Sequence, residues 1–245
     1  MAIFMYLKKL AKFILGRLPI KLHCLIQSLR LRGKAKIGCR SYIHSSVHLL
    51  GKDSIRVGNN TCVSEGTWLN VNHRQEGKVA IDIGSNCFIG KNNFFSSGDM
   101  ILIGDYTLTT IGCKFIGSTH KIDDPEVPYL LSGTTSNDQI RIGVNCFLGA
   151  GSTVLGNVKV GHGSVIGANS LVLHDIPPFS IAIGNPAKII KRYSFLHKAW
   201  LPASEVLFEN EIEMPNELEY LIQLKNKFPH VNMPWIAAGK SMGDQ

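Results

Sequence analysis

The residue best suited to acid–base chemistry is His120, which lies at the start of a long polar stretch, residues 117–139. Imidazole titrates near neutral pH and is well matched to remove a proton from a hydroxyl group. The stretch is rich in Gly, Ser, Thr, Asp and Pro, and long polar segments inside a compact domain usually serve function. From position alone, His120 is either a catalytic base or an ordinary histidine of a surface loop.

Two further groups of residues could bind a substrate. A polar insertion at residues 70–78 contains His73, flanked by Asn72 and Arg74, and these side chain types bind sugar hydroxyls or phosphates. A solvated loop tip is the competing interpretation. Near the end of the patterned region, Lys188, Lys191 and Arg192 place three basic residues within five positions. Such a group would hold a ligand that carries several phosphates, or form a solvated corner.

The elements that must position these residues follow a six-residue repeat. From Ile142 to Val172 an apolar residue recurs every sixth place, with glycine after most of them. An amphipathic helix would space its apolar residues at three and four, so short strands are indicated. Three six-residue units would close one triangular coil, and sets of three begin at residues 37, 57, 83, 103, 142 and 160. The sequence therefore predicts an all-β solenoid, a parallel β-helix of six coils.

The cysteines fit this repeat. Cys87, Cys113 and Cys146 each occupy the small position four places after an apolar residue, so we expect buried thiols rather than disulfides. The sequence contains no CxxC pair and no HExxH motif, which gives zinc chemistry little support. We therefore expect no metal, and a reducing, cytoplasmic compartment.

The two ends of the chain differ from the repeat. Residues 1–36 hold nine Lys or Arg and no acidic residue, and their apolar spacing predicts amphipathic helices. These helices either cap the solenoid or contact an anionic membrane through residues 1–30, at the inner face of the cytoplasmic membrane. The remaining chain is almost neutral, and we expect no nucleic acid partner. Residues 193–245 are expected to form a helical extension, with a helix near 215–228.

Residues 37–192 resemble the hexapeptide-repeat acyltransferases, whose β-helix is left-handed. Residues 103–120 are similar to the galactoside and maltose acetyltransferases, and the signatures at 175–178 (Asp-Ile-Pro-Pro) and 184–188 (Gly-Asn-Pro-Ala-Lys) resemble the closing coils of that family and of polysaccharide O-acetyltransferases. The resemblance implies a homotrimer with active sites between subunits and acetyl-CoA as co-substrate. It implies that His120 is the general base and that the N–H of Ala150 binds the oxyanion. It places the pantetheine against Ala150, Ala168 and Leu173, and the phosphates near Lys188, Lys191 and Arg192.

The sequence departs from that family at the acceptor side. The asparagine that contacts sugar in the galactoside enzymes corresponds to Gly90, and Asn92 and Asn93 follow directly, so these two become candidates for acceptor binding. Phe147 replaces a common tryptophan and keeps the pocket wall aromatic.

The interpretation that follows is O-acetylation of a sugar hydroxyl, in a bacterial capsule or lipopolysaccharide glycan. An N-acetyltransferase acting on an amino sugar nucleotide shares the fold and the donor. A non-catalytic scaffold is the alternative from another class. A carbonic anhydrase on the same helix would require a histidine where this chain has Pro125.

Overall fold

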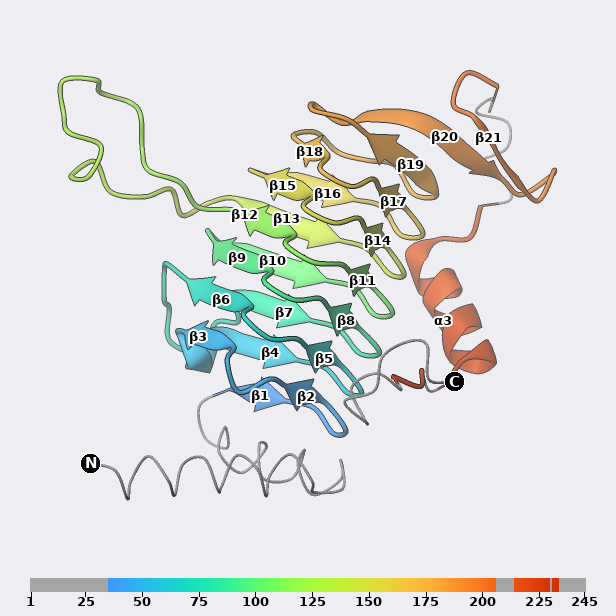
Figure 1. Ribbon diagram of the computed structural model, residues 1–245, viewed down its shortest axis with the longest axis horizontal. Coiled ribbons are helices and arrows are strands. Elements are labelled where there is room, and N and C mark those ends of the chain that lie inside the picture. Colours follow the sequence, from blue (N-terminus) through green and yellow to red (C-terminus); the bar gives the residue numbers. More distant parts are fainter. Residues whose placement is uncertain (1–34, 206–213, 230, 234–245) are drawn as a thin grey trace, which may run out of the picture.

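The computed structural model describes residues 35–205, 214–229 and 231–233 (Figure 1). The segment 1–34, for which the sequence predicts amphipathic helices, lies outside the described residues. The boundary expected at residue 36 falls within the first strand of the solenoid, β1.

The described chain winds into a parallel β-helix of six coils, each with one strand in each of three sheets. Sheet A contains β1 (Lys36–Ile37), β4 (Ile55–Val57), β7 (Ile81–Ile83), β10 (Met100–Ile103), β13 (Gln139–Ile142) and β16 (Val158–Val160). Sheet B contains β2 (Tyr42–Ile43), β5 (Cys62–Val63), β8 (Phe88–Ile89), β11 (Leu108–Thr109), β14 (Phe147–Leu148) and β17 (Val165–Ile166). Sheet C contains β3 (His48–Leu50), β6 (Trp68–Val71), β9 (Phe94–Ser97), β12 (Lys114–Ile116), β15 (Thr153–Leu155) and β18 (Leu171–Val172).

The register of these sheets confirms the six-residue repeat and its slips. The six residues predicted to begin the coils are successive partners in sheet A: Ile37, Val57, Ile83, Ile103, Ile142 and Val160. Insertions of two residues or more therefore leave the stack intact, because they project at the corners. The fold is the predicted left-handed parallel β-helix.

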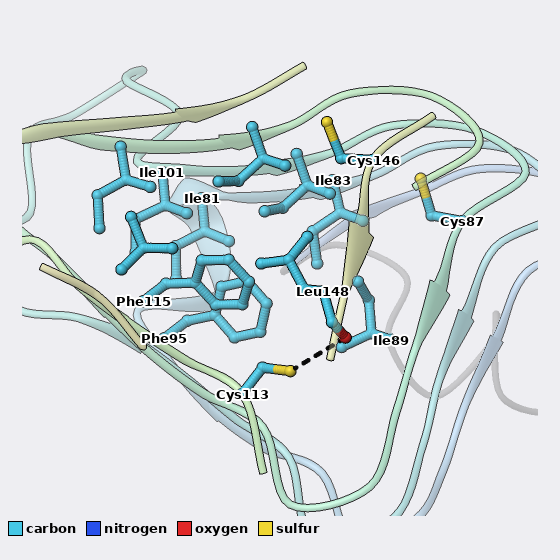
Figure 2. Close-up of a cluster of buried hydrophobic side chains, with 14 of the residues drawn as sticks. Ile81, Ile83, Cys87, Ile89, Phe95, Ile101, Cys113, Phe115, Cys146 and Leu148 are labelled. Carbon is cyan, nitrogen blue, oxygen red and sulfur yellow. Dashed lines mark hydrogen bonds between the residues drawn. The ribbon is translucent and has the colours of Figure 1, made fainter. Parts of the chain in front are cut away.

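The core is a column of stacked apolar side chains inside the prism (Figure 2). The rings of Phe95 and Phe115 stack at 4.5 Å between centroids, one coil above the other. Cys87, Cys113 and Cys146 are buried free thiols, as the sequence predicts. Burial raises the pKa of both the Cys87 and Cys146 thiols to about 12, so neither is a nucleophile at neutral pH.

We name the corners of the prism by the sheets that they join: the AB edge, the BC edge and the CA edge. The BC edge consists of residues 44–47, 64–67, 90–93, 110–113, 149–152 and 167–170, and the CA edge includes residues 51–54, 72–80, 98–99 and 117–138. The 3-10 turn η1 (Lys52–Ser54) lies on the CA edge. In five successive coils, one residue of the BC edge adopts positive φ, between 55° and 71°. All five are Gly or Asn: Gly66, Asn92, Gly112, Gly151 and Asn169. These are the residue types that tolerate the left-handed region.

The C-terminal part covers one end of the prism with strands, and a helix packs along the side of the prism. Strand β19 (Ser180–Ile183) joins sheet B in parallel, and β20 (Lys188–Ser194) and β21 (Ala199–Pro202) continue it as antiparallel strands. The expected domain boundary at residue 192 therefore falls inside β20. Helix α3 (Glu217–Lys227), confirming the helix expected near 215–228, begins with a capping box of Asn216 and Glu219. Among the described residues, no helix has the length and apolar character needed to cross a membrane.

Candidate active site

Both large insertions leave the prism at the CA edge. Residues 117–138 connect β12 to β13 and project far from the solenoid, and residues 72–80 connect β6 to β7 two coils away (Figure 1). The insertion expected at 70–78 is thus shifted, because β6 keeps Asn70 and Val71 within the strand.

His120 lies at the root of the longer loop, where the two arms of the loop pair. It forms an antiparallel bridge with Thr134. On either side, the N–H of Thr135 donates to the Thr119 carbonyl at 2.8 Å, and the N–H of Lys121 donates to the Gly133 carbonyl at 3.1 Å. His120 is exposed. The imidazole is therefore open to a substrate, while its backbone is fixed on a two-stranded ribbon.

The structure also brings His73 to this ribbon. Its Nε2 lies 3.0 Å from the hydroxyl oxygen of Thr134. Directly opposed residues of an antiparallel pair present their side chains on the same side, so Thr134 and His120 share a face that His73 also contacts. The two histidines singled out in the sequence thus gather around Thr134. The sequence pattern contains no signal for Thr134, because its role depends on how the loop folds back.

An acidic residue fixes the base of the loop. Asp99 lies in the two-residue turn between β9 and β10, and its carboxylate pairs with the Lys78 ammonium and accepts a hydrogen bond from Gln139 Nε2 at 2.6 Å. The hydrogen bond from Lys78 is the main cause that lowers the pKa of Asp99. Lys78 belongs to one insertion and Gln139 follows the other, so Asp99 ties the two together. Sequence reasoning missed this residue.

Three of the residues expected to contact CoA meet at the BC edge. Ala150 and Ala168 occupy the same corner position in successive coils, linked by a hydrogen bond of 2.7 Å from the Asn169 N–H to the Ala150 carbonyl. The turn at residues 184–187 lies above them, and Lys188 follows it at the start of β20. The N–H of Ala150 donates to no group within the described chain. It is therefore free to donate to a ligand.

The other residues of that group lie apart from this corner. Lys191 and Arg192 are further along β20 and pair with Ile181 and Ser180, at the beginning of β19. Leu173 follows β18, at the CA end of sheet C, and is 38% exposed. Within a single chain, the six residues expected to contact CoA are therefore distributed over the last coils and β20.

The acceptor candidates Asn92, Asn93 and Phe147 lie away from His120 in the same chain. Asn93 is 1% exposed, and its Nδ2 donates to the carbonyls of Gly90 and Thr110 at 2.8 and 2.7 Å. Its side chain therefore holds the corner together. Asn92 fills the positive-φ position of the BC edge, and Phe147 is 39% exposed on the outward side of sheet B.

The two halves of the candidate site are on different edges of the prism. His120 and His73 lie at the CA edge, whereas Ala150, Ala168 and Lys188 lie at the BC edge, and sheet C separates these edges. Within one chain, His120 and Ala150 are not brought together.

Comparison with known proteins identifies the repeat. Residues 140–174 match the family described as "Bacterial transferase hexapeptide (six repeats)". The chain is 29% identical over 129 residues to a "Probable acetyltransferase" of Mycobacterium tuberculosis, which covers 51% of this chain. It is 40% identical over 114 residues, or 45% of this chain, to "Probable serine acetyltransferase 2" of Oryza sativa subsp. japonica. It spans only 43% and 29% of the lengths of these two relatives.

The fold also matches solved structures. One is AntD, an N-acyltransferase from Bacillus cereus in complex with dTDP and 3-hydroxybutyryl-CoA, with a TM-score of 0.60 and 18% identity, covering 83% of this chain and 94% of AntD. Another is an AntD variant in complex with dTDP-4-amino-4,6-dideoxyglucose and coenzyme A, with a TM-score of 0.60 and 19% identity, covering 83% and 95%. The repeat of residues 140–174 thus matches the bacterial transferase hexapeptide family, the curated relatives that resemble the chain are described as acetyltransferases, and the AntD structures share its fold.

Proposed function

We propose that this protein is an acetyl-CoA-dependent O-acetyltransferase that acetylates a hydroxyl group of a sugar. The observation that carries the proposal is the placement of His120: an exposed imidazole, on a fixed ribbon, projecting from the edge of a hexapeptide-repeat β-helix.

The reaction would be direct transfer. The imidazole of His120 takes the proton of the acceptor hydroxyl as its oxygen attacks the thioester carbonyl of acetyl-CoA. The tetrahedral intermediate collapses by breaking the C–S bond, and the departing thiolate takes the proton from the imidazolium. The free N–H of Ala150 is a donor suited to the oxyanion. Direct transfer requires no acyl-enzyme, and burial raises the pKa of the Cys87 and Cys146 thiols to about 12, so neither thiol is a nucleophile at neutral pH.

The CoA site is best supported at the BC edge. Small side chains at Ala150 and Ala168 leave room for a narrow pantetheine arm, and the basic residues of β20 suit the phosphates. Because His120 lies on the other side of sheet C, transfer needs the CA edge of one copy beside the BC edge of another. A homotrimer provides three such contacts.

The acceptor side is the CA edge, where His73 and the neighbouring amides can bind hydroxyl groups. We propose a capsule or lipopolysaccharide unit as acceptor, on the cytoplasmic side of the membrane. The basic residues 1–30, which lie outside the described structure, would then contact anionic lipid.

The test is an acceptor screen with radiolabelled acetyl-CoA and bacterial glycan fragments. His120→Ala should reduce turnover about 100-fold to 10,000-fold, because a general base supplies a factor of that order. CoA binding and assembly size should stay unchanged. The matched control is His197→Ala, an exposed histidine in the turn between β20 and β21, which should keep wild-type turnover. Undiminished transfer by His120→Ala would exclude this mechanism, and no transfer by the wild type would favour a scaffold.

The second candidate is N-acylation of an amino sugar nucleotide. AntD, which shares this fold over 83% of the chain, is an N-acyltransferase whose structure holds dTDP-4-amino-4,6-dideoxyglucose. Mild alkali distinguishes the two products, because it removes an acetyl ester and leaves an acetamide. Mass spectrometry of the treated product then decides between them.

A further inference from the structure

The outward side of β6, continued by Asn72, carries a row of aromatic and amide side chains that take no part in the proposed transfer step. Trp68 is 51% exposed at the start of the strand, and Asn70 and Asn72 follow on the same side. Leu69 and Val71 alternate with them and are 0% and 1% exposed in the core. This is the two-residue period of a strand with one buried face.

One end of the row is aromatic. The His48 ring lies 4.7 Å from the Trp68 ring, tilted by 42°, and Phe94 is in register with Trp68 on the neighbouring strand. The indole thus packs against His48 on one side and keeps about half of its surface exposed. Such a flat aromatic surface with a polar N–H suits the apolar C–H face of a pyranose ring.

The other end of the row is polar and incompletely paired. Asn70 Nδ2 donates to Asn72 Oδ1 at 2.7 Å, and Asn72 Nδ2 donates to Ser96 Oγ at 2.8 Å. The Oδ1 of Asn70 is buried and has no hydrogen-bond partner among the described residues. A buried acceptor without a donor is costly, and a sugar hydroxyl is a donor of the right size.

This row leads to the candidate active site. Ser96 Oγ lies 3.4 Å from the carbonyl of Ser118, two residues before His120. Trp68 is two coils away from β12, at the opposite end of its strand from the CA edge. With strand rises of about 3.3 Å and a spacing of about 4.8 Å between coils, the separation of Trp68 from the His120 ribbon is on the order of 20 Å. That span exceeds one sugar ring.

We propose that Trp68, Asn70 and Asn72 form a second acceptor subsite, which binds a sugar residue remote from the one that is acetylated. The acceptor is therefore an oligosaccharide or longer glycan rather than a free monosaccharide. This inference rests on the proposed function, since it takes His120 as the reacting end. A second copy of the chain is the competing occupant of this face. The paired amides and the unpaired Asn70 Oδ1 favour a hydroxyl-rich ligand over a protein surface.

The experiment measures binding without acetyl-CoA, so that it does not depend on transfer. Ligand-observed NMR on the full chain would use the core oligosaccharides released from lipopolysaccharide by mild acid, capsular polysaccharide fragments, and free glucose and galactose. The variants are Trp68→Ala and Trp68→Phe, with Leu196→Ala as control, since Leu196 is 64% exposed in the β20–β21 turn. Light scattering reports the assembly size of each.

We expect the wild type to bind an oligosaccharide at least about tenfold more tightly than either monosaccharide, which corresponds to about 1.4 kcal/mol. Trp68→Ala should lose that preference, Trp68→Phe should keep most of it, and Leu196→Ala should bind like the wild type. Equal binding by Trp68→Ala and the wild type, or a smaller assembly for Trp68→Ala, would overturn the proposal. Binding without any acetyl transfer would refute the proposed function and leave the glycan site in place. If Trp68→Ala transfers acetyl groups to the glycan as fast as the wild type does, the glycan site is refuted and the proposed function stands.

Discussion

His120 owes its position to backbone pairing and to one side chain contact from outside its own loop. The ribbon fixes the two arms of the loop against each other, and Thr134 connects that ribbon to His73. Because Thr134 directly opposes His120, a shift of the threonine shifts the imidazole as well. Thr134 and His73 are therefore positioning residues in the proposed reaction.

Replacing Thr134 with valine tests this role, since valine keeps the shape and removes the hydroxyl. We expect kcat to fall roughly tenfold, because misplacing a base by a fraction of an ångström costs about that much. The KM for acetyl-CoA should stay unchanged, because CoA is proposed to bind at the other edge. His73→Ala should have a similar effect, and the double variant should be no worse than either single one. Additive losses would show that the two residues act independently. Thr153→Val, on sheet C, is the control.

At the scale of elements, Asp99 clamps the roots of both insertions to the turn between β9 and β10. The pKa of its carboxyl group is lowered, mainly by the hydrogen bond from Lys78. A group with a lowered folded-state pKa contributes stability above its unfolded pKa, and that contribution is lost as the pH falls through the folded value. The clamp should therefore hold at neutral pH and weaken in acid, below about pH 4.

Asp99→Asn should remove this part of the acid sensitivity. At pH 7 we expect a loss of about 1 kcal/mol or less, because Lys78 is partly exposed and solvent screens the pair. As the pH falls from neutral toward 3, the free energy of unfolding of the variant should decline less than that of the wild type. Urea unfolding at several pH values measures both, with Asp53→Asn as an exposed control. Parallel pH profiles for Asp99→Asn and the wild type would show that the clamp does not titrate as described.

The sequence predicted the elements of the prism better than the arrangement of its loops. Six-residue spacing fixes which side chains point inward, so the starting residues of the coils from Ile37 to Val160 could be read directly. The hairpin of β20 and β21 has no such period, so the sequence pattern does not predict it. The contact of His73 with Thr134 joins residues 61 positions apart, and no local pattern encodes a pairing of that kind. The sequence makes Asn93 a candidate for acceptor binding because it lies close after Gly90. In the structure, however, its Nδ2 donates to the Gly90 carbonyl within the BC edge.

At the scale of the whole molecule, the proposed reaction needs two chains. His120 and Ala150 lie on opposite sides of sheet C in one chain. A ring of three identical subunits would bring the CA edge of each beside the BC edge of the next.

Mixed assemblies test this arrangement. His120→Ala and Ala150→Asp should each be inactive, the second because a carboxylate enters the proposed CoA and oxyanion site. When the two variants are co-expressed, about a quarter of the interfaces should combine an intact CA edge with an intact BC edge. We therefore expect acetyl transfer to return to roughly that fraction of the wild-type rate. Complete inactivity of the mixed assemblies, after mass spectrometry shows that both chains are present, would place both residues in one subunit.

Helix α3 and the residues on either side of it have a consequence for how the prism unfolds. In a stack of repeats each coil contacts only its neighbours, so segments can separate one after another. Here the Pro215 carbonyl lies 3.0 Å from His162 Nε2, and the Glu217 carboxylate accepts from the Val144 N–H at 3.0 Å. The Phe228 carbonyl accepts from the Tyr106 hydroxyl at 2.8 Å, and the Val231 carbonyl accepts from Asn60 Nδ2 at 3.0 Å. The segment from Pro215 to Val231 therefore connects coils two to six along the side of the prism. Distant rungs then share a common restraint, and loosening at one end of the column must be felt at the other.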